Sequence, residues 1–158
     1  FSGIWLAFIG FFLLQAAKAE ARHGAARREL TGALVRNLMT PNPVSVESSS
    51  TLGEFMENVA WGRQFATYPV LESGQVIGLL VLQCALDTPR QDWDRRSVVE
   101  CMIPRERVPV LAETETAESA LAKLAATRVN RGLVFDGDEL IGLISISDLA
   151  RAAQPRRA

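Results

Sequence analysis

Ser145 and Asp148 are polar side chains three residues apart, placed where an apolar run gives way to an alanine-rich segment. Such a run is typical of a buried strand that leads into a helix, and the first turn of a helix presents free N–H groups that can hold a phosphate. There, Ser145 could donate a hydrogen bond to a phosphate, and Asp148 could accept from two ribose hydroxyls. The alternative is a structural pair, in which Ser145 or Ser147 caps the helix and Asp148 interacts with its dipole.

The elements that would position these residues occur twice along the chain. Each copy has apolar residues at helical spacing, which predicts one amphipathic helix per copy. The repeat predicts two units, each running strand–helix–strand–strand–helix. Three pairs of segments match, at an offset of 64 (140 − 76) for the first two and 63 (102 − 39) for the third: residues 76–81 and 140–145, 68–72 and 132–136, and 39–41 and 102–104.

An M-x-P motif, a P-V strand and a closing G-h-h-[ST]-x-x-D motif, in this order, are similar to the motifs of CBS domains. Residues 36–151 resemble two such domains packed as a pair, the arrangement called a Bateman module. The resemblance implies an α+β fold in which two tandem CBS units form a pseudo-two-fold disc with two clefts. It also implies that one cleft binds an adenine nucleotide such as AMP, ADP or ATP, as in many members of the family.

The resemblance further implies which residues hold the nucleotide. Gly142, Ser145 and Asp148 belong to the closing motif of the second unit, where the hydroxyl and the carboxylate would contact phosphate and ribose. Arg131 lies just before the strand expected at Leu133–Val134, where a basic residue in similar CBS domains can reach the phosphates, and a guanidinium suits bidentate phosphate contacts. The alternative for Arg131 is an ordinary surface side chain.

The first unit departs from the motif. Val81 stands where the hydroxyl is expected, and Cys84 stands where the carboxylate is expected. Neither an apolar side chain nor a thiol can replace a ribose-binding carboxylate, so we expect one nucleotide-competent cleft per pair. Val108 and Leu133 are expected beside the base in that cleft, on the resemblance alone.

Residues 1–17 contain no charged side chain and are rich in Phe, Leu and Ile. A membrane-spanning helix needs about 20 apolar residues, so this run is expected to be the end of a transmembrane helix, in a fragment that starts inside it. A signal peptide with a cleavage site at residues 17–19, or a buried core helix, is the alternative. Basic residues outnumber acidic ones over residues 18–36, which predicts that the following part is cytoplasmic.

Residues 3–14 read Gly-Ile-Trp-Leu-Ala-Phe-Ile-Gly-Phe-Phe-Leu-Leu and precede a charged, helical segment. This resembles the last membrane helix of site-2-protease-type (M50 family) intramembrane zinc metalloproteases, some of which carry a CBS pair directly after it. The resemblance implies a regulatory CBS pair attached to a protease domain that lies upstream, with the zinc ligands and catalytic residues there and none in this chain. The alternatives are the regulatory pair of a membrane transporter or channel, and a dimerisation module that binds nothing.

Composition narrows the expected partners. The net charge is −1 and the pI is about 5.9, so the chain lacks the basic bias of nucleic-acid-binding proteins. His23 is the only histidine, so no metal site is assigned. Cys84 and Cys101 lie in no C-x-x-C motif, and we expect buried free thiols in a reducing compartment. The expected partners are an adenine nucleotide, the membrane, the upstream protease domain and a second copy of the chain.

The predicted organisation follows from these segments. In the first unit, residues 51–54 have the spacing of a capping box that opens the amphipathic helix. Trp93, in the linker, is expected to dock on the disc. The predicted boundaries are a transmembrane end at 1–17, a helical connector at 18–35, the first CBS unit at 36–88, the linker at 89–97, the second CBS unit at 98–153 and a tail at 154–158.

Overall fold

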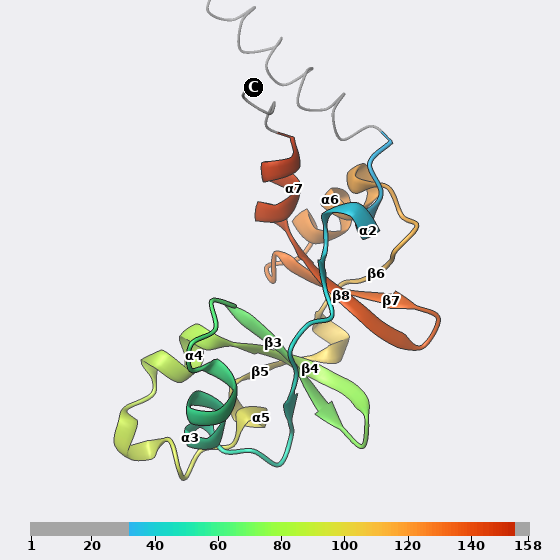
Figure 1. The fold of residues 1–158 in the computed structure, drawn as a ribbon. Coiled ribbons are helices and arrows are strands. Elements are labelled where there is room, and N and C mark those ends of the chain that lie inside the picture. The colour runs from blue at the N-terminus through green and yellow to red at the C-terminus, as the bar shows by residue number, and fades with distance from the viewer. Residues whose placement is uncertain (1–31, 154–158) are drawn as a thin grey trace, which may run out of the picture.

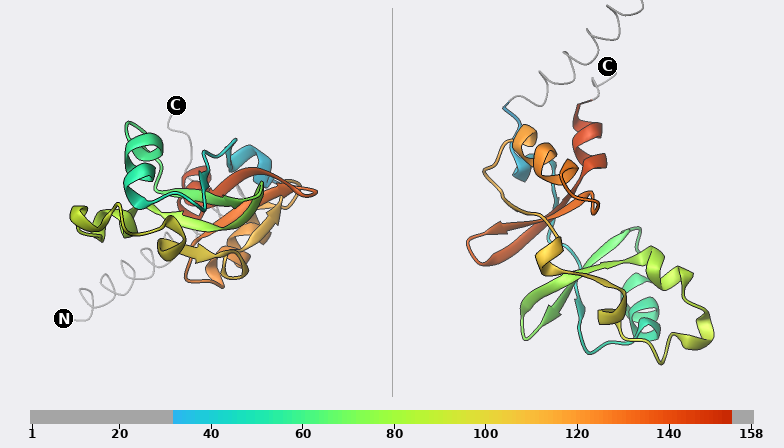
Figure 2. Two further views of the ribbon diagram at one scale, coloured as in Figure 1. Left: turned by 90° about the horizontal axis from the view of Figure 1, so that it is seen from below. Right: turned by 180° about the vertical axis from the view of Figure 1, so that it is seen from behind.

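The computed structural model describes residues 32–153, so the predicted transmembrane segment, most of the connector and the tail lie outside the described residues. The described chain forms two lobes, each with a four-stranded sheet and helices packed against it (Figure 1). Views from below and from behind show the same arrangement (Figure 2). Within residues 32–153, no helix is long and apolar enough to cross a membrane.

The first repeat contains short helices and a long antiparallel hairpin. Thr51 begins the amphipathic helix with the predicted capping box, in which its hydroxyl accepts from the Glu54 amide and the Glu54 carboxylate accepts from the Thr51 amide. The helix soon widens into a π-helix. The elements are α2 (Val35–Leu38), β1 (Thr40–Pro41), β2 (Val46–Glu47), α3 (Leu52–Glu54), η1 (Phe55–Ala60), β3 (Thr67–Glu72), β4 (Gln75–Val81) and α4 (Leu82–Asp87).

The second repeat follows the same order after a linker that contains the 3-10 helix η2 (Arg90–Asp92). Its main helix is longer and starts at an N-cap, Thr116, whose hydroxyl accepts from the Ser119 amide. The elements are α5 (Val98–Cys101), β5 (Met102–Pro104), η3 (Arg105–Arg107), β6 (Val110–Ala112), α6 (Ala117–Ala125), β7 (Arg131–Asp136), β8 (Glu139–Ser145) and α7 (Ile146–Ala152).

Each sheet contains one strand from the other repeat. The sheet of the first lobe has the order β2-β3-β4-β5, and that of the second lobe has the order β1-β8-β7-β6. Strand β1 therefore pairs antiparallel with β8, and β5 pairs antiparallel with β4. The two units thus exchange the strands that carry the M-x-P motifs, which interlocks the lobes.

The exchange explains why a glycine recurs in each hairpin. A Cβ atom on Gly142 would meet the Met39 side chain and would lie 3.1 Å from the Thr40 carbonyl oxygen. In the other lobe, a Cβ atom on Gly78 would lie 2.6 Å from both the Ile103 carbonyl oxygen and the Met102 sulfur. The methionine and the glycine of the motifs therefore form a packing contact between repeats.

Apolar side chains form three buried clusters. The first fills the lobe of α3, α4 and α5 and includes Phe55 and Tyr68, whose rings meet edge to face at 4.9 Å. The second lies under α2, α6 and α7 and includes Val35, which is fully buried. The third joins the lobes through Leu79, Val108 and Leu133.

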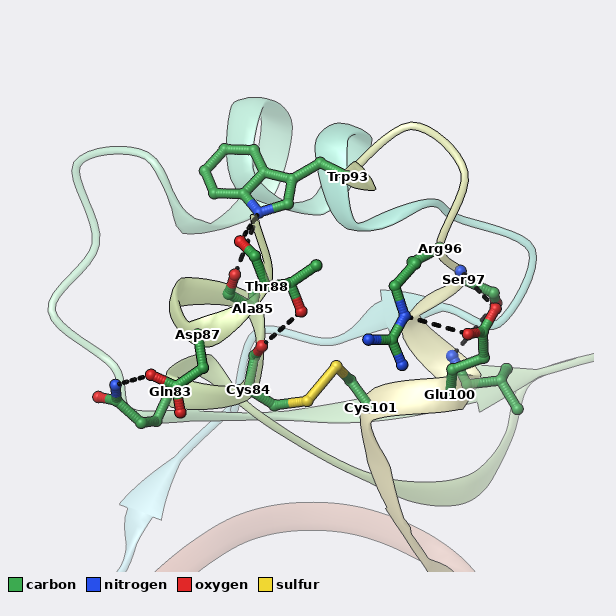
Figure 3. Close-up of a disulfide and its surroundings, with 11 residues drawn as sticks. Gln83, Cys84, Ala85, Asp87, Thr88, Trp93, Arg96, Ser97, Glu100 and Cys101 are labelled. Carbon is green, nitrogen blue, oxygen red and sulfur yellow. Dashed lines mark hydrogen bonds and ion pairs between the residues drawn. A yellow bond between two sulfur atoms is a disulfide. The ribbon is translucent and has the colours of Figure 1, made fainter. Parts of the chain in front are cut away.

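The cysteines correct one prediction. Cys84 in α4 and Cys101 at the end of α5 form a disulfide, with their Cα atoms 5.8 Å apart, so the expected free thiols are absent (Figure 3). The reason is the exchanged strand: β5 follows Cys101 directly and pairs with β4, which ends just before α4. The pairing brings together two residues that are 17 positions apart in the sequence.

The linker inside this disulfide loop is held by Trp93, as predicted. The half-buried indole packs on the first cluster, and its N–H donates to the carbonyl oxygens of Ala85 at 3.1 Å and Thr88 at 3.0 Å. The Thr88 hydroxyl in turn donates to the Cys84 carbonyl oxygen at 2.9 Å (Figure 3). The segment between the cysteines is therefore docked on the lobe by hydrogen bonds as well as by the disulfide.

Candidate functional site

A cavity of about 260 Å³ lies where the two repeats meet, at the start of α7. One wall comes from the loop that leads into β3, and the other comes from the end of β8 and the first turns of α7. The cavity therefore needs both repeats. Its lining residues are Thr40, Gln64, Phe65, Ala66, Thr67, Arg131, Leu143, Ile144, Ser145, Ser147, Asp148 and Arg151.

Ser145 and Asp148 lie side by side at this cavity and form a capping box. The Asp148 Oδ2 atom accepts from the Ser145 amide at 2.8 Å and from the Ser145 hydroxyl at 2.7 Å, while the Ser145 Oγ atom accepts from the Asp148 amide at 3.2 Å. The structural alternative is therefore present in the chain. The second carboxylate oxygen, Oδ1, lies 3.6 Å from the Arg151 guanidinium and takes no part in the box.

Arg131 lies opposite this pair, at the start of β7, where the strand register aligns it with Ser145. Its Nη1 atom donates to the buried Thr67 hydroxyl at 3.5 Å, which is a weak contact. The ion pairs described within residues 32–153 do not include Arg131. The cavity thus combines two guanidiniums, Arg131 and Arg151, with one carboxylate, which favours an anionic ligand that also carries hydroxyl donors.

The sequence-predicted residues do not all reach the cavity. Arg131, Ser145 and Asp148 line it, whereas Gly142 is buried in β8 against the strand β1 and is absent from the lining. Val108 and Leu133, expected beside the base, belong to the cluster that joins the lobes and are also absent from the lining.

Sequence reasoning missed the wall formed by residues 64–67. Two hydrogen bonds hold this wall. Thr67 accepts from Arg131 of the second repeat, and the Ala66 carbonyl oxygen accepts from the Leu82 amide of α4 at 2.9 Å. Thr67 and Arg131 are 64 positions apart, which is the repeat offset, so they are equivalent residues of the two units that meet. The repeat offset was the signal that could have identified Thr67, whereas residues 64–66 follow no motif.

The first-repeat counterpart of the motif lacks these groups. Val81 takes the hydroxyl position, and α4 has no side-chain cap at its N-terminus. Cys84 takes the carboxylate position and is bonded to Cys101. The disulfide thus occupies the position that corresponds to Asp148 in the second repeat.

A second cavity of about 610 Å³ lies at the ends of the two hairpins. It mixes apolar, acidic and basic side chains, and the Arg105 guanidinium stacks over the Phe135 ring at 5.2 Å. Across residues 32–153, no group of three or more His, Cys, Asp and Glu side chains could hold a metal ion. The second cavity, as far as residues 32–153 show, therefore holds no metal-ligating cluster.

Comparisons with known proteins agree with this fold. The sequence model of the CBS domain matches residues 35–84 and 98–154. Among solved structures, the CBS domain of a bacterial CNNM/CorC family Mg²⁺ transporter in complex with ATP has a TM-score of 0.72 at 23% identity, covering 85% of this chain and 96% of that one. CBSX2 in complex with AMP has a TM-score of 0.62 at 22% identity, covering 77% and 96%.

Three different curated relatives are described as zinc metalloproteases. "Putative zinc metalloprotease Rip3" of Mycobacterium tuberculosis is 28% identical over 94% of this chain and 38% of its own length. Zinc metalloprotease MJ0392 of Methanocaldococcus jannaschii is 27% identical over 94% of this chain and 40% of its own length. The chain thus spans about two fifths of these relatives. The family model matches both repeats, and each sheet contains one strand from the other repeat. The chain therefore belongs to the CBS domain family, as a pair of CBS domains.

Proposed function

We propose that this CBS pair binds one adenine nucleotide in the cavity between its repeats and regulates a membrane-bound zinc metalloprotease. The observation that carries the nucleotide proposal is the convergence of Arg131, Ser145 and Asp148 on one cavity. Arg131 and Arg151 would bind phosphate oxygens, because charge-assisted hydrogen bonds from guanidinium are strong and directional. The Asp148 Oδ1 atom, which the capping box does not use, would accept from the ribose hydroxyls.

Two solved neighbours support the choice of nucleotide, since one is described in complex with ATP and another in complex with AMP. The cavity volume of about 260 Å³ lies just below the usual range for ligand pockets, so the ligand would extend beyond its mouth. The first repeat has Val81 and Cys84 where the second has Ser145 and Asp148, so we propose one nucleotide per pair.

The test is calorimetric titration of the 158-residue chain with AMP, ADP and ATP, comparing wild type with Asp148→Asn. The asparagine keeps an oxygen that can accept from the Ser145 amide, so the helix cap is largely retained while the charged ribose acceptor is lost. We expect one site with a dissociation constant between micromolar and millimolar, weakened at least tenfold in Asp148→Asn. A tenfold loss corresponds to about 1.4 kcal/mol.

The matched control is Glu54→Gln, which changes the chemically similar Thr51–Glu54 capping box outside the cavity. It should bind the nucleotide as wild type does. Absence of heat with millimolar AMP, ADP and ATP would reject the nucleotide proposal. Wild-type affinity in Asp148→Asn would place the ligand elsewhere and leave Asp148 as a capping residue only.

The regulatory part of the proposal rests on the metalloprotease relatives and on the uncharged segment at residues 1–17. In this proposal, residues 1–17 end a transmembrane helix, the CBS pair is cytoplasmic, and an upstream domain in the same protein carries the zinc and the catalytic residues. Residues 18–31 would connect that domain to α2, so a nucleotide-dependent change in the pair could reach the protease. The regulatory pair of a transporter or channel, and a non-binding dimerisation module, are the competing functions.

Membrane anchoring is tested by expressing the 158-residue chain and separating membranes by ultracentrifugation without detergent. We expect the chain in the membrane pellet, extracted by detergent but not by high salt. Recovery in the supernatant would contradict the anchor.

The upstream sequence separates the protease from the transporter: an H-E-x-x-H helix in that region supports the protease.

A further inference from the structure

The Cys84–Cys101 disulfide joins α5 to α4, the helix that is hydrogen-bonded to the wall of the cavity. Cys84 lies in α4, the helix whose first amide, that of Leu82, donates to the Ala66 carbonyl oxygen at 2.9 Å. Ala66 and the neighbouring Thr67 line the cavity. The position of α4 therefore helps to fix the wall against which Arg131 rests.

Cys101, the other cysteine of the disulfide, lies beside the strand exchanged between the repeats. Cys101 ends α5 and immediately precedes β5, the exchanged strand that pairs with β4. Strand β4 leads into α4 through Val81, whose strand register aligns it with Thr67 of the cavity wall. The disulfide thus closes a loop that runs through α4, the docked linker and α5, and β4 and β5 flank this loop (Figure 3).

The surroundings of the disulfide suit a reversible bond. Cys101 is buried with 7% of its surface exposed, whereas Cys84 is only half-buried, so an attacking thiolate has more access on the Cys84 side. Hydrogen bonds hold the linker from both ends independently of the sulfur atoms, through Trp93 to Ala85 and Thr88, and through the Leu52 amide to the Arg96 carbonyl oxygen. Loss of the disulfide would therefore loosen this lobe without removing its packing.

We propose that Cys84 and Cys101 form a redox-modification site. Their oxidation state determines how well ordered residues 64–67 of the cavity wall are, and thereby the affinity of the cavity for a nucleotide. In the oxidised state the disulfide holds α4, so residues 64–67 are pre-organised. In the reduced state α4 is freed to move, and the wall must be ordered when the ligand binds. Pre-organisation reduces the entropy that binding must offset, so the oxidised form should bind more tightly. The affinity part rests on the nucleotide site proposed above.

The chemistry balances with a dithiol as the reductant. A thiolate of the dithiol attacks one sulfur of the disulfide and forms a mixed disulfide, and its second thiolate then releases the protein thiol. Two electrons and two protons pass to the protein, giving two cysteine thiols, while the dithiol becomes a disulfide. Oxidation runs the same exchange in reverse with a disulfide-bonded oxidant. Disulfides of the cytosol are typically of this redox-sensing kind, which reconciles the bond with the cytoplasmic placement proposed above.

The experiment compares the 158-residue chain in detergent after oxidation with oxidised glutathione and after reduction with dithiothreitol. Hydrogen exchange is followed at the Leu82 amide and over residues 64–67, and ATP is titrated by calorimetry in both states. We expect exchange at Leu82 to rise at least fivefold on reduction and ATP affinity to fall about three- to tenfold. The matched control is the double variant Cys84→Ser/Cys101→Ser. Its Leu82 exchange and ATP affinity should equal those of the reduced protein and should not change on addition of dithiothreitol.

The two readouts separate this inference from the nucleotide proposal. If ATP gives no heat in either state, the nucleotide proposal fails, and faster Leu82 exchange on reduction still supports the redox control of the wall. Equal exchange at Leu82 in both states overturns the inference. So does ATP affinity that agrees within twofold between oxidised and reduced protein, or the finding of two titratable thiols after oxidation.

Discussion

Asp148 uses its two carboxylate oxygens differently. Oδ2 accepts from both the amide and the hydroxyl of Ser145, whereas Oδ1 faces the exposed Arg151 guanidinium. A residue with one oxygen committed to the fold and one near a cavity can cap a helix and bind a ligand at once. The two interpretations of the Ser145–Asp148 pair are therefore compatible, and substitutions must be chosen to separate them.

Ser145→Ala should mainly lower the stability of the fold, whereas Asp148→Asn should mainly lower the affinity for the nucleotide. The alanine removes the N-cap of α7, so the free energy of unfolding should fall by about 1 kcal/mol. Nucleotide affinity should fall less than in Asp148→Asn, because the hydroxyl is one of several donors at the cavity. Urea unfolding and calorimetry on the same sample measure both effects. A larger loss of affinity than of stability would assign the hydroxyl mainly to the ligand.

Glu115 should give the acid dependence of stability. Burial by itself raises the pKa of this carboxyl, but hydrogen bonds from Lys123, the Ala112 amide and Ser119, with the Lys123 charge, outweigh burial and hold the pKa below its ordinary value. A carboxyl whose pKa is lower in the folded state stabilises the protein above its unfolded pKa, near 4.3, and loses that contribution as pH falls through the folded pKa.

Glu115→Gln should therefore lower the free energy of unfolding at pH 7 and lose less stability on acidification than wild type does. Urea unfolding at pH 7, 5 and 3.5 measures the difference, which should shrink as pH falls. The control is Glu106→Gln at an exposed position in η3. A difference between wild type and Glu115→Gln that stays constant over this range would assign the effect to lost packing.

At the scale of elements, the exchanged strands decide which glycines can change. Gly142 in β8 and Gly78 in β4 face the methionines of the exchanged strands, with no room for a Cβ atom. Overpacking of this kind costs typically about 1–3 kcal/mol. The M-x-P and glycine motifs thus act as a matched pair across repeats.

Gly142→Ala should lower the free energy of unfolding by about 1–3 kcal/mol in urea. Adding Met39→Ala should restore part of that loss, because the methionine side chain is the nearest group to the added Cβ atom. If the two substitutions were additive, the contact between them would not be the cause. Wild-type stability in Gly142→Ala alone would contradict the packing argument.

The elements also show what the sequence could predict. The repeat, the capping box at Thr51 and the Ser145–Asp148 pair were accessible, because each is a local pattern with a fixed spacing. The strand exchange was not, because the pairing of β1 with β8 joins residues about a hundred positions apart and leaves no local pattern. The disulfide was missed for the same reason, since it depends on the pairing of β5 with β4. The wall at residues 64–66 was missed because it lies in a loop without a motif.

At the scale of the whole molecule, the module begins earlier than its repeats suggest. Val35 is fully buried, its amide donates to the Glu115 carbonyl oxygen at 2.9 Å, and the Ala117 amide donates to the Ala33 carbonyl oxygen at 2.8 Å. Leu34 forms an isolated bridge with Thr116. Residues 33–35 thus belong to the second lobe although they precede the first repeat.

A fragment that starts at residue 32 should therefore be more stable than one that starts at residue 36. Burial of a valine side chain contributes about 1.5–3 kcal/mol, and the backbone hydrogen bonds that residues 33–35 make with Asn37, Met39, Glu115 and Ala117 are lost with it. Urea unfolding of residues 32–158 and 36–158 tests this, with the midpoint of the shorter fragment expected at a lower concentration. Equal midpoints would show that Val35 contributes little to the fold.

The interlocked strands also affect how the protein responds to a protease. Arg90 and Arg95 are exposed in the linker between Cys84 and Cys101. A single cut there would leave two polypeptides that share both sheets and stay covalently joined through the disulfide. The nicked molecule should run as one band on a non-reducing gel and as two on a reducing gel, so comparison of the two gels after limited trypsin digestion would report whether Cys84 and Cys101 are bonded.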